Sequence, residues 1–187
     1  PIRENILSLH KNKYKPSTVK GNFNLLILGG SQGSKILSYN LCKQIIGLPS
    51  YIKKRIKLYH QVHKEDLNLV KNTYKKNRIN SEVIDFFIDI NEKIKRANLV
   101  ISRAGSSTIF ENAIAGIPAI YFPLKNSAGN HQYMNAQVLK RKMAAWVFEE
   151  KDIEKRFFLE TLEEIINNRK QLKKFSVNKK KFSKPDA

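Results

Sequence analysis

Short apolar runs alternate with helical segments along most of this 187-residue chain. Runs that are apolar throughout, rather than apolar at every second residue, are typical of parallel strands buried on both faces by helices. The apolar runs lie at residues 23–28, 56–62, 82–87, 99–101, 119–122 and 144–148, and the helical segments at 35–46, 64–76, 91–96, 107–115, 131–142 and 152–168. We therefore predict an α/β fold, with a Rossmann-like doubly wound parallel sheet of about six strands.

The chain is long enough for one well-packed α/β domain and too short for two. We expect a polar connecting segment at residues 1–22, one domain at 23–168, and a basic segment at 169–187 that is either a helical extension or a disordered tail. The chain begins with Pro1 rather than Met. We therefore expect it to be a fragment, or a split subunit, of a larger protein.

The net charge of +19 would suit a nucleic acid or an anionic membrane. Residues 169–187 hold eight Lys and Arg against one Asp, which is +7 of the total. The basic residues lack an interleaved aromatic platform or a DNA-reading motif, so we expect no nucleic-acid partner. Two alternatives stay open for residues 169–187 and for the basic helix at 64–78: contact with an anionic membrane surface, or an ordinary solvated surface.

A metal site and a disulfide are not expected. His60 and His63 are three residues apart in a predicted strand, so they point to opposite faces. The single cysteine, Cys42, lies among apolar residues and reads as a small buried hydrophobic residue, which fits a reducing cytoplasm. We predict no cofactor.

Two turns with small residues follow predicted strands and open predicted helices. The first, at residues 29–34, is Gly-Gly-Ser-Gln-Gly-Ser, and Gly29, Gly30 and Gly33 could let its backbone N–H groups cradle a phosphate. It fits neither the dinucleotide fingerprint nor the P-loop. The equally weighted alternative is a glycine turn needed only for strand–helix geometry.

The second turn, Ser-Arg-Ala-Gly-Ser-Ser-Thr at 102–108, lies in the stretch around which the chain is organised. Small residues there leave a helix N-terminus open to an anion. Glu111 lies one helical turn beyond Ser107 and Thr108, where its carboxylate could accept hydrogen bonds from sugar hydroxyls.

Two further loops reach the same carboxyl edge of the predicted sheet. The loop at 125–132 brings His131 and Gln132 there. Phe87 and Ile90 could form the wall of a base-binding site, with backbone groups at Phe87 supplying hydrogen bonds to the base. Each residue taken singly would more often be a core or capping residue. Their joint placement predicts a nucleotide-sugar site.

Four motifs, at 29–34, 102–111, 115–119 and 130–136, resemble the MurG family. The resemblance covers residues 1 to about 168 and implies the C-terminal, donor-binding half of a GT-B glycosyltransferase. Such an enzyme moves N-acetylglucosamine from UDP-GlcNAc to lipid-linked MurNAc-pentapeptide (lipid I) and makes lipid II for peptidoglycan. It would work in the cytoplasm, peripherally on the inner face of the cell membrane.

The resemblance also assigns roles to residues. Residues 1–22 become the hinge from a missing N-terminal domain, with Arg3 near the nucleotide. The other substrate-binding positions are Ser31, Ser107 and Thr108 for the diphosphate, Phe87 and Ile90 for the uracil, Glu111 for the ribose, and His131 and Gln132 for the donor sugar. The chain contains no Asp-x-Asp metal motif, so metal-independent transfer with inversion is expected. No residue fits the catalytic base, which we assign to the missing half.

Two alternatives to this function remain. One is a GT-B enzyme that uses a different nucleotide sugar, because the sugar-reading loop alone separates these classes. The other is a nucleotide-sugar-binding or anionic-surface-binding domain that catalyses nothing.

Overall fold

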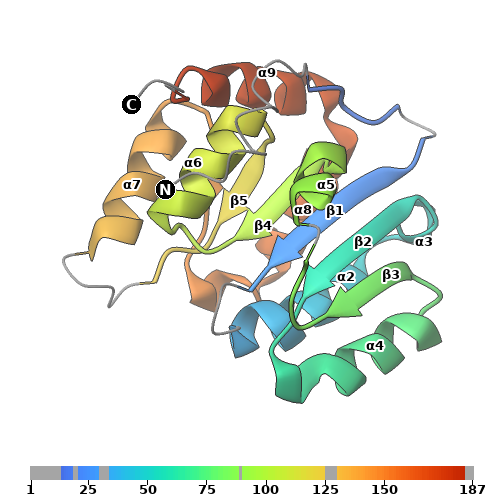
Figure 1. Cartoon of the computed structure of the whole chain (residues 1–187). Helices are drawn as coiled ribbons and strands as arrows, with labels where there is room; N and C mark the ends of the chain where they lie inside the picture. The colour runs from blue at the N-terminus through green and yellow to red at the C-terminus, as the bar shows by residue number, and fades with distance from the viewer. Residues whose placement is uncertain (1–13, 19–20, 30–33, 89, 125–129, 184–187) are drawn as a thin grey trace.

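The computed structural model describes residues 14–18, 21–29, 34–88, 90–124 and 130–183 (Figure 1). Within these ranges the chain forms one six-stranded sheet in the order β3-β2-β1-β4-β5-β6, and all of its strand pairs are parallel. The strands are β1 (Phe23–Leu28), β2 (Ile56–Gln61), β3 (Asn80–Ile84), β4 (Leu99–Ser102), β5 (Ala119–Tyr121) and β6 (Trp146–Val147). This strand order is that of the doubly wound α/β fold, so the predicted fold class is confirmed.

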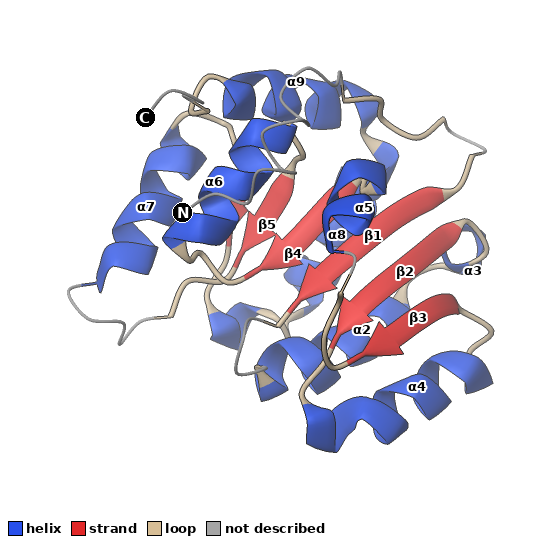
Figure 2. Ribbon diagram, viewed as in Figure 1, coloured by secondary structure: helices blue, strands red, loops and turns tan. Residues whose placement is uncertain are grey.

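Helices connect the strands, and three more, the last in the list below, follow β6. They are η2 (Ile36–Asn40), α2 (Leu41–Gly47), α3 (Ser50–Lys53), η3 (Lys64–Asp66), α4 (Leu67–Lys76), α5 (Ile90–Arg96), α6 (Ser106–Ala115), α7 (His131–Arg141), η5 (Glu150–Asp152), α8 (Arg156–Asn167) and α9 (Arg169–Lys180). Figure 2 shows the helices layered on the two sides of the sheet. None of the helices in the described ranges is long and apolar enough to cross a membrane.

Each face of the sheet has its own core. Side chains that alternate along β1 point to opposite faces: Leu25 and Ile27 pack with α2, α4 and α8, whereas Leu26 packs with α5, α6 and α7. The strands are therefore buried on both sides, as their apolar runs predicted. Cys42 is a free, buried cysteine of the first core, as expected.

Three predicted elements differ from the observed ones by more than one residue at a boundary. β3 covers residues 80–84 instead of 82–87, and β6 is only two residues long. The helix predicted at 152–168 is divided into η5 and α8. The side chain of Asp152 accepts a hydrogen bond from the backbone N–H of Glu149 at 2.9 Å and closes a capping box, so the chain turns there before α8 begins.

Residues 169–180, expected as a helical extension or a tail, form the helix α9, which packs on α6 and α8. Leu172 and Phe175 of α9 are buried. Gly116, which ends α6 with φ of +64°, lies so close to α9 that a Cβ there would be 2.6 Å from Cε of Lys180. The folded domain therefore includes α9.

The side chain of Lys179 is fully buried where α9 meets the sheet. Its Nζ lies 2.8 Å from the hydroxyl of Tyr121 on β5, and Asn112 of α6 donates a hydrogen bond to the same hydroxyl at 3.4 Å. Burial lowers the pKa of Lys179 well below its usual range, because the charged amine loses its hydration.

We predict that Lys179→Met raises the free energy of unfolding at pH 7 by about 1 kcal/mol, since replacing a buried charge-bearing group by an apolar one of similar size is often stabilising. Because the pKa is lowered on folding, the unfolded chain binds a proton that the folded chain does not at any pH between the folded and unfolded pKa values. In the wild type, this difference in proton binding lowers the free energy of unfolding. The loss is absent above the unfolded pKa of Lys and grows as the pH falls below it.

Chemical denaturation between pH 7 and 10.5 tests this prediction. The difference between Lys179→Met and wild type should shrink as the pH rises. Lys170→Met, at an exposed position of α9, should change stability by less than about 0.5 kcal/mol at every pH. A loss of about 3 kcal/mol or more in Lys179→Met would show instead that the amine is essential for docking α9.

Candidate functional site

Strand register brings four loops to one level at the carboxyl edge of the sheet. Leu28 pairs with Ser102, Ser102 with Tyr121, and Tyr121 with Val147, and each of these residues is the last of its strand. The loops that follow β1, β4, β5 and β6 therefore begin side by side. In open parallel sheets ligands bind at this edge, outside the strand ends.

The N-terminus of α6 lies at this edge and lacks a side-chain cap. Its N-cap residue is Gly105, with φ of −64° and ψ of 142°, and the first turn contains no acidic residue. Ser106 and Ser107 are exposed, and Thr108 is half-buried. The free N–H groups and positive dipole end of this ten-residue helix are thus open to an anion.

The side chain of Arg103, which follows β4, contacts the loops that follow β1, β5 and β6. Its guanidinium donates to Oγ of Ser34 at 2.7 Å and to the carbonyl oxygen of Phe122 at 3.3 Å, and it forms an ion pair with Glu150. Only 14% of the Arg103 side chain is exposed. This arginine lies inside a predicted motif, but we assigned it no role, because its partners lie 19 to 69 residues away along the chain.

The predicted ribose and sugar residues lie on α6 and α7. Glu111 is half-buried one turn along α6, on the helix that presents Ser107 and Thr108. His131 is exposed at the start of α7. The side chain of Gln132 accepts a hydrogen bond from the backbone N–H of Leu124 at 3.2 Å, so it connects α7 to the end of the loop after β5.

The predicted base wall needs a correction at Phe87. Its ring is 3% exposed and belongs to the core beside α5, so it offers almost no surface to a base. Its neighbours Phe86 and Ile88 are the exposed ones, at 63% and 93%, and Ile90 is half-buried. Three consecutive apolar residues gave no periodicity from which to choose the inward one.

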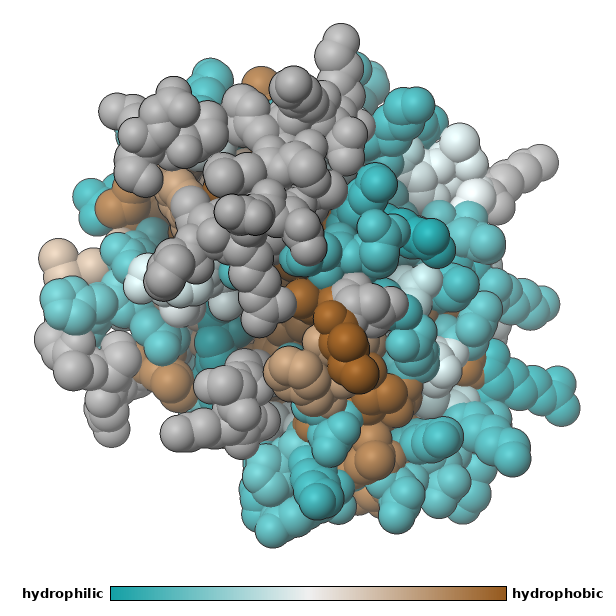
Figure 3. Space-filling view, in the orientation of Figure 1, coloured by the Kyte–Doolittle hydropathy of each residue, from teal (hydrophilic) through white to brown (hydrophobic). Residues whose placement is uncertain are grey.

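Figure 3 shows apolar side chains in the middle of the view, over the carboxyl ends of β1 and β2.

Four of the predicted positions, Arg3, Ser31, Gly30 and Gly33, lie outside the described residues. Gly29 is buried directly after β1.

Metal-ligating side chains do not cluster in the described part of the chain, where no group of three His, Cys, Asp or Glu residues could hold an ion. His60 is fully buried. Its ring nitrogens lie 2.9 Å from the hydroxyl of Tyr74 and 2.9 Å from the carbonyl oxygen of Leu37, and burial lowers its pKa to about 4. It is a neutral core residue.

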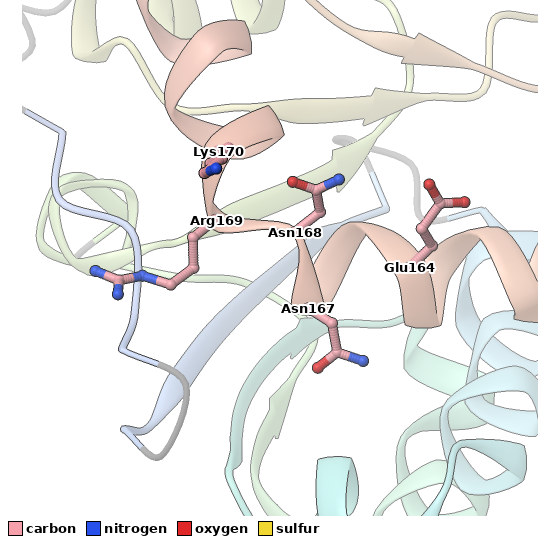
Figure 4. A pocket seen from close by; sticks show the side chains of 5 residues that line it. All are labelled: Glu164, Asn167, Asn168, Arg169 and Lys170. Carbon is pink, nitrogen blue, oxygen red and sulfur yellow. The ribbon is translucent and has the colours of Figure 1, made fainter.

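Two hollows can be described from the part of the chain that the structure covers. One, of about 420 Å³, lies next to the candidate site between α7 and the residues after β6, and includes Tyr133, Lys140 and Phe157. The other, of about 410 Å³, lies at the junction of α8 and α9, and its side chains point in several directions (Figure 4). Asn167 there donates a hydrogen bond to Tyr51 of α3, which precedes β2, so this second hollow is away from the carboxyl edge.

Residues 24–187 match the family model described as glycosyltransferase family 28 C-terminal domain. Two similar curated proteins are both named UDP-N-acetylglucosamine–N-acetylmuramyl-(pentapeptide) pyrophosphoryl-undecaprenol N-acetylglucosamine transferase. The one from Rickettsia felis is 36% identical over 182 residues, which is 95% of this chain and 51% of that protein. The one from Paramagnetospirillum magneticum is 33% identical over 187 residues, which is 100% of this chain and 50% of that protein.

Among solved structures, the chain is similar to MurG from Acinetobacter baumannii, with a TM-score of 0.76 and 26% identity. The superposition covers 96% of this chain and 49% of that one. The chain thus spans about half the length of the curated relatives it matches. The similarity extends through α9, beyond the range over which the sequence motifs alone had indicated it.

We predict that Arg103→Lys lowers the free energy of unfolding by about 1–3 kcal/mol, because an ammonium group cannot replace the planar fork that reaches three partners. The matched control is Arg156→Lys. Arg156 is 90% exposed and pairs with Glu160 on the same helix, so its replacement should cost less than about 0.5 kcal/mol. Equal, small losses in the two variants on urea denaturation would contradict the role of Arg103.

Proposed function

Because this chain belongs to the glycosyltransferase family 28 C-terminal domain family, we propose that it is the donor-binding half of an inverting N-acetylglucosaminyltransferase. In this proposal the enzyme moves N-acetylglucosamine from UDP-GlcNAc to lipid-linked MurNAc-pentapeptide. It acts in the cytoplasm, at the inner face of the cell membrane. The observation that carries the proposal is the uncapped N-terminus of α6, at the level where four strand ends meet.

The diphosphate of the donor would bind at the start of α6. There the helix dipole and the hydroxyls of Ser107 and Thr108 face an anion without a competing carboxylate in the first turn. The same groups would stabilise the charge that develops on the leaving UDP, which is the task that a metal ion performs in other transferases. Ser31 and Arg3 would add to this binding.

The remainder of the donor would extend along the same edge. Glu111 would accept hydrogen bonds from the ribose, and His131 and Gln132 would contact the sugar. Uracil would lie near Ile90 and the backbone of Phe87, since the Phe87 ring is in the core.

In the transfer step the acceptor hydroxyl oxygen would bond to the anomeric carbon as that carbon's bond to the UDP oxygen breaks. A base in the other half of the enzyme would take the hydroxyl proton. The acceptor must lie within about 3–3.5 Å of the reacting carbon, which requires a second wall for the cleft.

We predict that Gly105→Ala weakens UDP binding at least tenfold. A Cβ at Gly105 would stand 4.0 Å from Oγ1 of Thr108, and no other heavy atom beyond the adjacent residues lies within 4 Å of it in the described chain. The added methyl group would therefore fit the empty domain but would obstruct an anion beside Thr108. The stability cost should stay below about 1 kcal/mol, the cost of a poorer N-cap residue.

Calorimetry with UDP, in EDTA, measures this effect. Gly47→Ala is the matched control, because Gly47 lies at the end of α2 and its Cβ would meet only Leu159, at 3.4 Å. That variant should bind UDP like the wild type. Unchanged UDP affinity in Gly105→Ala, or an absolute requirement for Mg²⁺, would place the diphosphate elsewhere.

We also predict that residues 1–187 alone bind UDP-GlcNAc but transfer no sugar to lipid I, and that adding the matching N-terminal half restores transfer. In the restored enzyme, His131→Ala should impair the use of UDP-GlcNAc more than the binding of UDP, because the imidazole is assigned to the sugar alone. A labelled-donor assay tests both parts. Robust transfer by the isolated chain would show that the base is misassigned, and preference for another nucleotide sugar would change the assigned donor.

A further inference from the structure

The hollow of about 420 Å³ between α7 and the residues after β6 lies directly beside the positions assigned to the donor sugar. We call it the α7–β6 hollow. Pro123 lines it and precedes Leu124, whose backbone N–H donates a hydrogen bond to the side chain of Gln132. Tyr133, which follows Gln132, lines it as well. The hollow has the volume of a small-molecule site, and it begins within one residue of a sugar-binding position.

One wall of the hollow is a face of α7. Tyr133, Gln137 and Lys140 line it, and their spacing of four and three residues places them on the same side of the helix. Between Gln132 and Lys140 the helix rises by about 12 Å. The wall therefore leads from the sugar-binding end of α7 to a lysine further along it.

Aromatic side chains supply the apolar part of the hollow. The rings of Phe148 and Phe157 have their centroids 6.2 Å apart, and Phe148 also contacts the core residue Phe158 at 5.1 Å. Phe157 is 44% exposed, and Tyr133 on the α7 wall is 39% exposed. A ligand thus meets aromatic surface that is anchored to the core.

The charged side chains of the hollow leave one ammonium group available. Lys151 pairs with Glu149 at 2.9 Å, and Lys155 pairs with Asp152 at 3.0 Å. Lys140 is exposed and makes no ion pair with any residue that the structure describes. A single carboxylate fits this arrangement better than a polyphosphate, which the two acidic side chains would repel.

The wall after β6 is held in a fixed position relative to the donor site. Glu150 lies between Glu149 and Lys151, which both line the hollow, and it pairs with the largely buried Arg103 that precedes α6. A ligand in the hollow and a donor at the start of α6 would therefore keep a defined geometry. Group transfer between two bound molecules requires such a geometry.

We propose that the α7–β6 hollow binds the peptide of the acceptor, with the carboxylate at the free end of the peptide paired to Lys140. This inference rests on the proposed function, in which the acceptor is a lipid-linked sugar that carries a pentapeptide. The acceptor hydroxyl must reach the anomeric carbon beside His131 and Gln132, so a group attached to the acceptor sugar comes close to the hollow.

The length of the peptide agrees with this placement. Five residues in an extended conformation span about 16 Å, which exceeds the rise of about 12 Å from Gln132 to Lys140. Two residues span about 7 Å and fall short of the lysine. A competing occupant is a segment of the missing N-terminal half of the enzyme, and the experiment below distinguishes the two.

Amide ¹H–¹⁵N spectra of the full 187-residue chain, titrated with N-acetylmuramyl-pentapeptide that carries no lipid, test the site. The largest shifts should belong to the amides of Gln137, Lys140 and residues 149–151. The same compound with its terminal carboxyl group amidated should bind about fivefold more weakly, because the charge-assisted contact with Lys140 is lost.

Four variants sharpen this test. Lys140→Gln should bind the peptide acid about fivefold more weakly and should no longer prefer the acid to the amide. Lys142→Gln is the matched control, because it removes the same charge from an exposed position outside the hollow. Gln137→Trp should fill the hollow and lower peptide affinity at least tenfold, whereas Asn135→Trp, at an exposed position that does not line it, should leave the affinity unchanged.

Three results would overturn the proposal: peptide-induced shifts outside the hollow, a preference for the acid that persists in Lys140→Gln, or equal losses in Lys140→Gln and Lys142→Gln. Absence of peptide binding would overturn it too. If the added N-terminal half then shifted the amides of the hollow, the hollow would be an interdomain contact.

Titration of the same four variants with UDP-GlcNAc keeps this proposal separate from the proposed function. All four should bind the donor like the wild type. Donor-induced shifts at the start of α6 without peptide binding would contradict the hollow alone, and peptide binding without donor-induced shifts would contradict the donor site alone.

Discussion

The level at which the parallel strands end is the constraint on which the candidate site depends. Leu28, Ser102, Tyr121 and Val147 are aligned across the sheet, so the loops that follow β1, β4, β5 and β6 start from the same row. Arg103 then fixes the loops relative to one another through Ser34, Phe122 and Glu150. A site built in this way needs few dedicated side chains, because the backbone positions the open end of α6.

Much of the fold followed from local sequence patterns. Apolar runs gave the positions of the strands, and small residues followed by helical segments gave the turns, because burial on both faces and an open helix start leave local signatures. β6 was overestimated because apolar residues continue past the two that pair with β5. α9 was left open because its sequence is mostly basic, and its four buried residues are recognisable only once α6 and α8 are in place.

The candidate site was predicted less completely for a similar reason. Serines, threonine and glutamate on α6 are close together in the sequence, so their placement on one helix could be predicted. The contacts of Arg103 join distant segments and have no local signature. At Phe87 three adjacent apolar residues left the inward one undetermined, and the structure buries the one that had been assigned to the base.

The central claim is that the free N–H groups at the start of α6 bind the diphosphate of the donor without a metal ion. Amide ¹H–¹⁵N spectra of the chain, titrated with UDP-GlcNAc in EDTA, test it most directly. The account predicts that the largest shifts belong to the amides of Ser106, Ser107 and Thr108, and that added Mg²⁺ does not enhance them. Shifts confined to the hollow at Asn167–Lys170, or shifts that appear only with Mg²⁺, would contradict it.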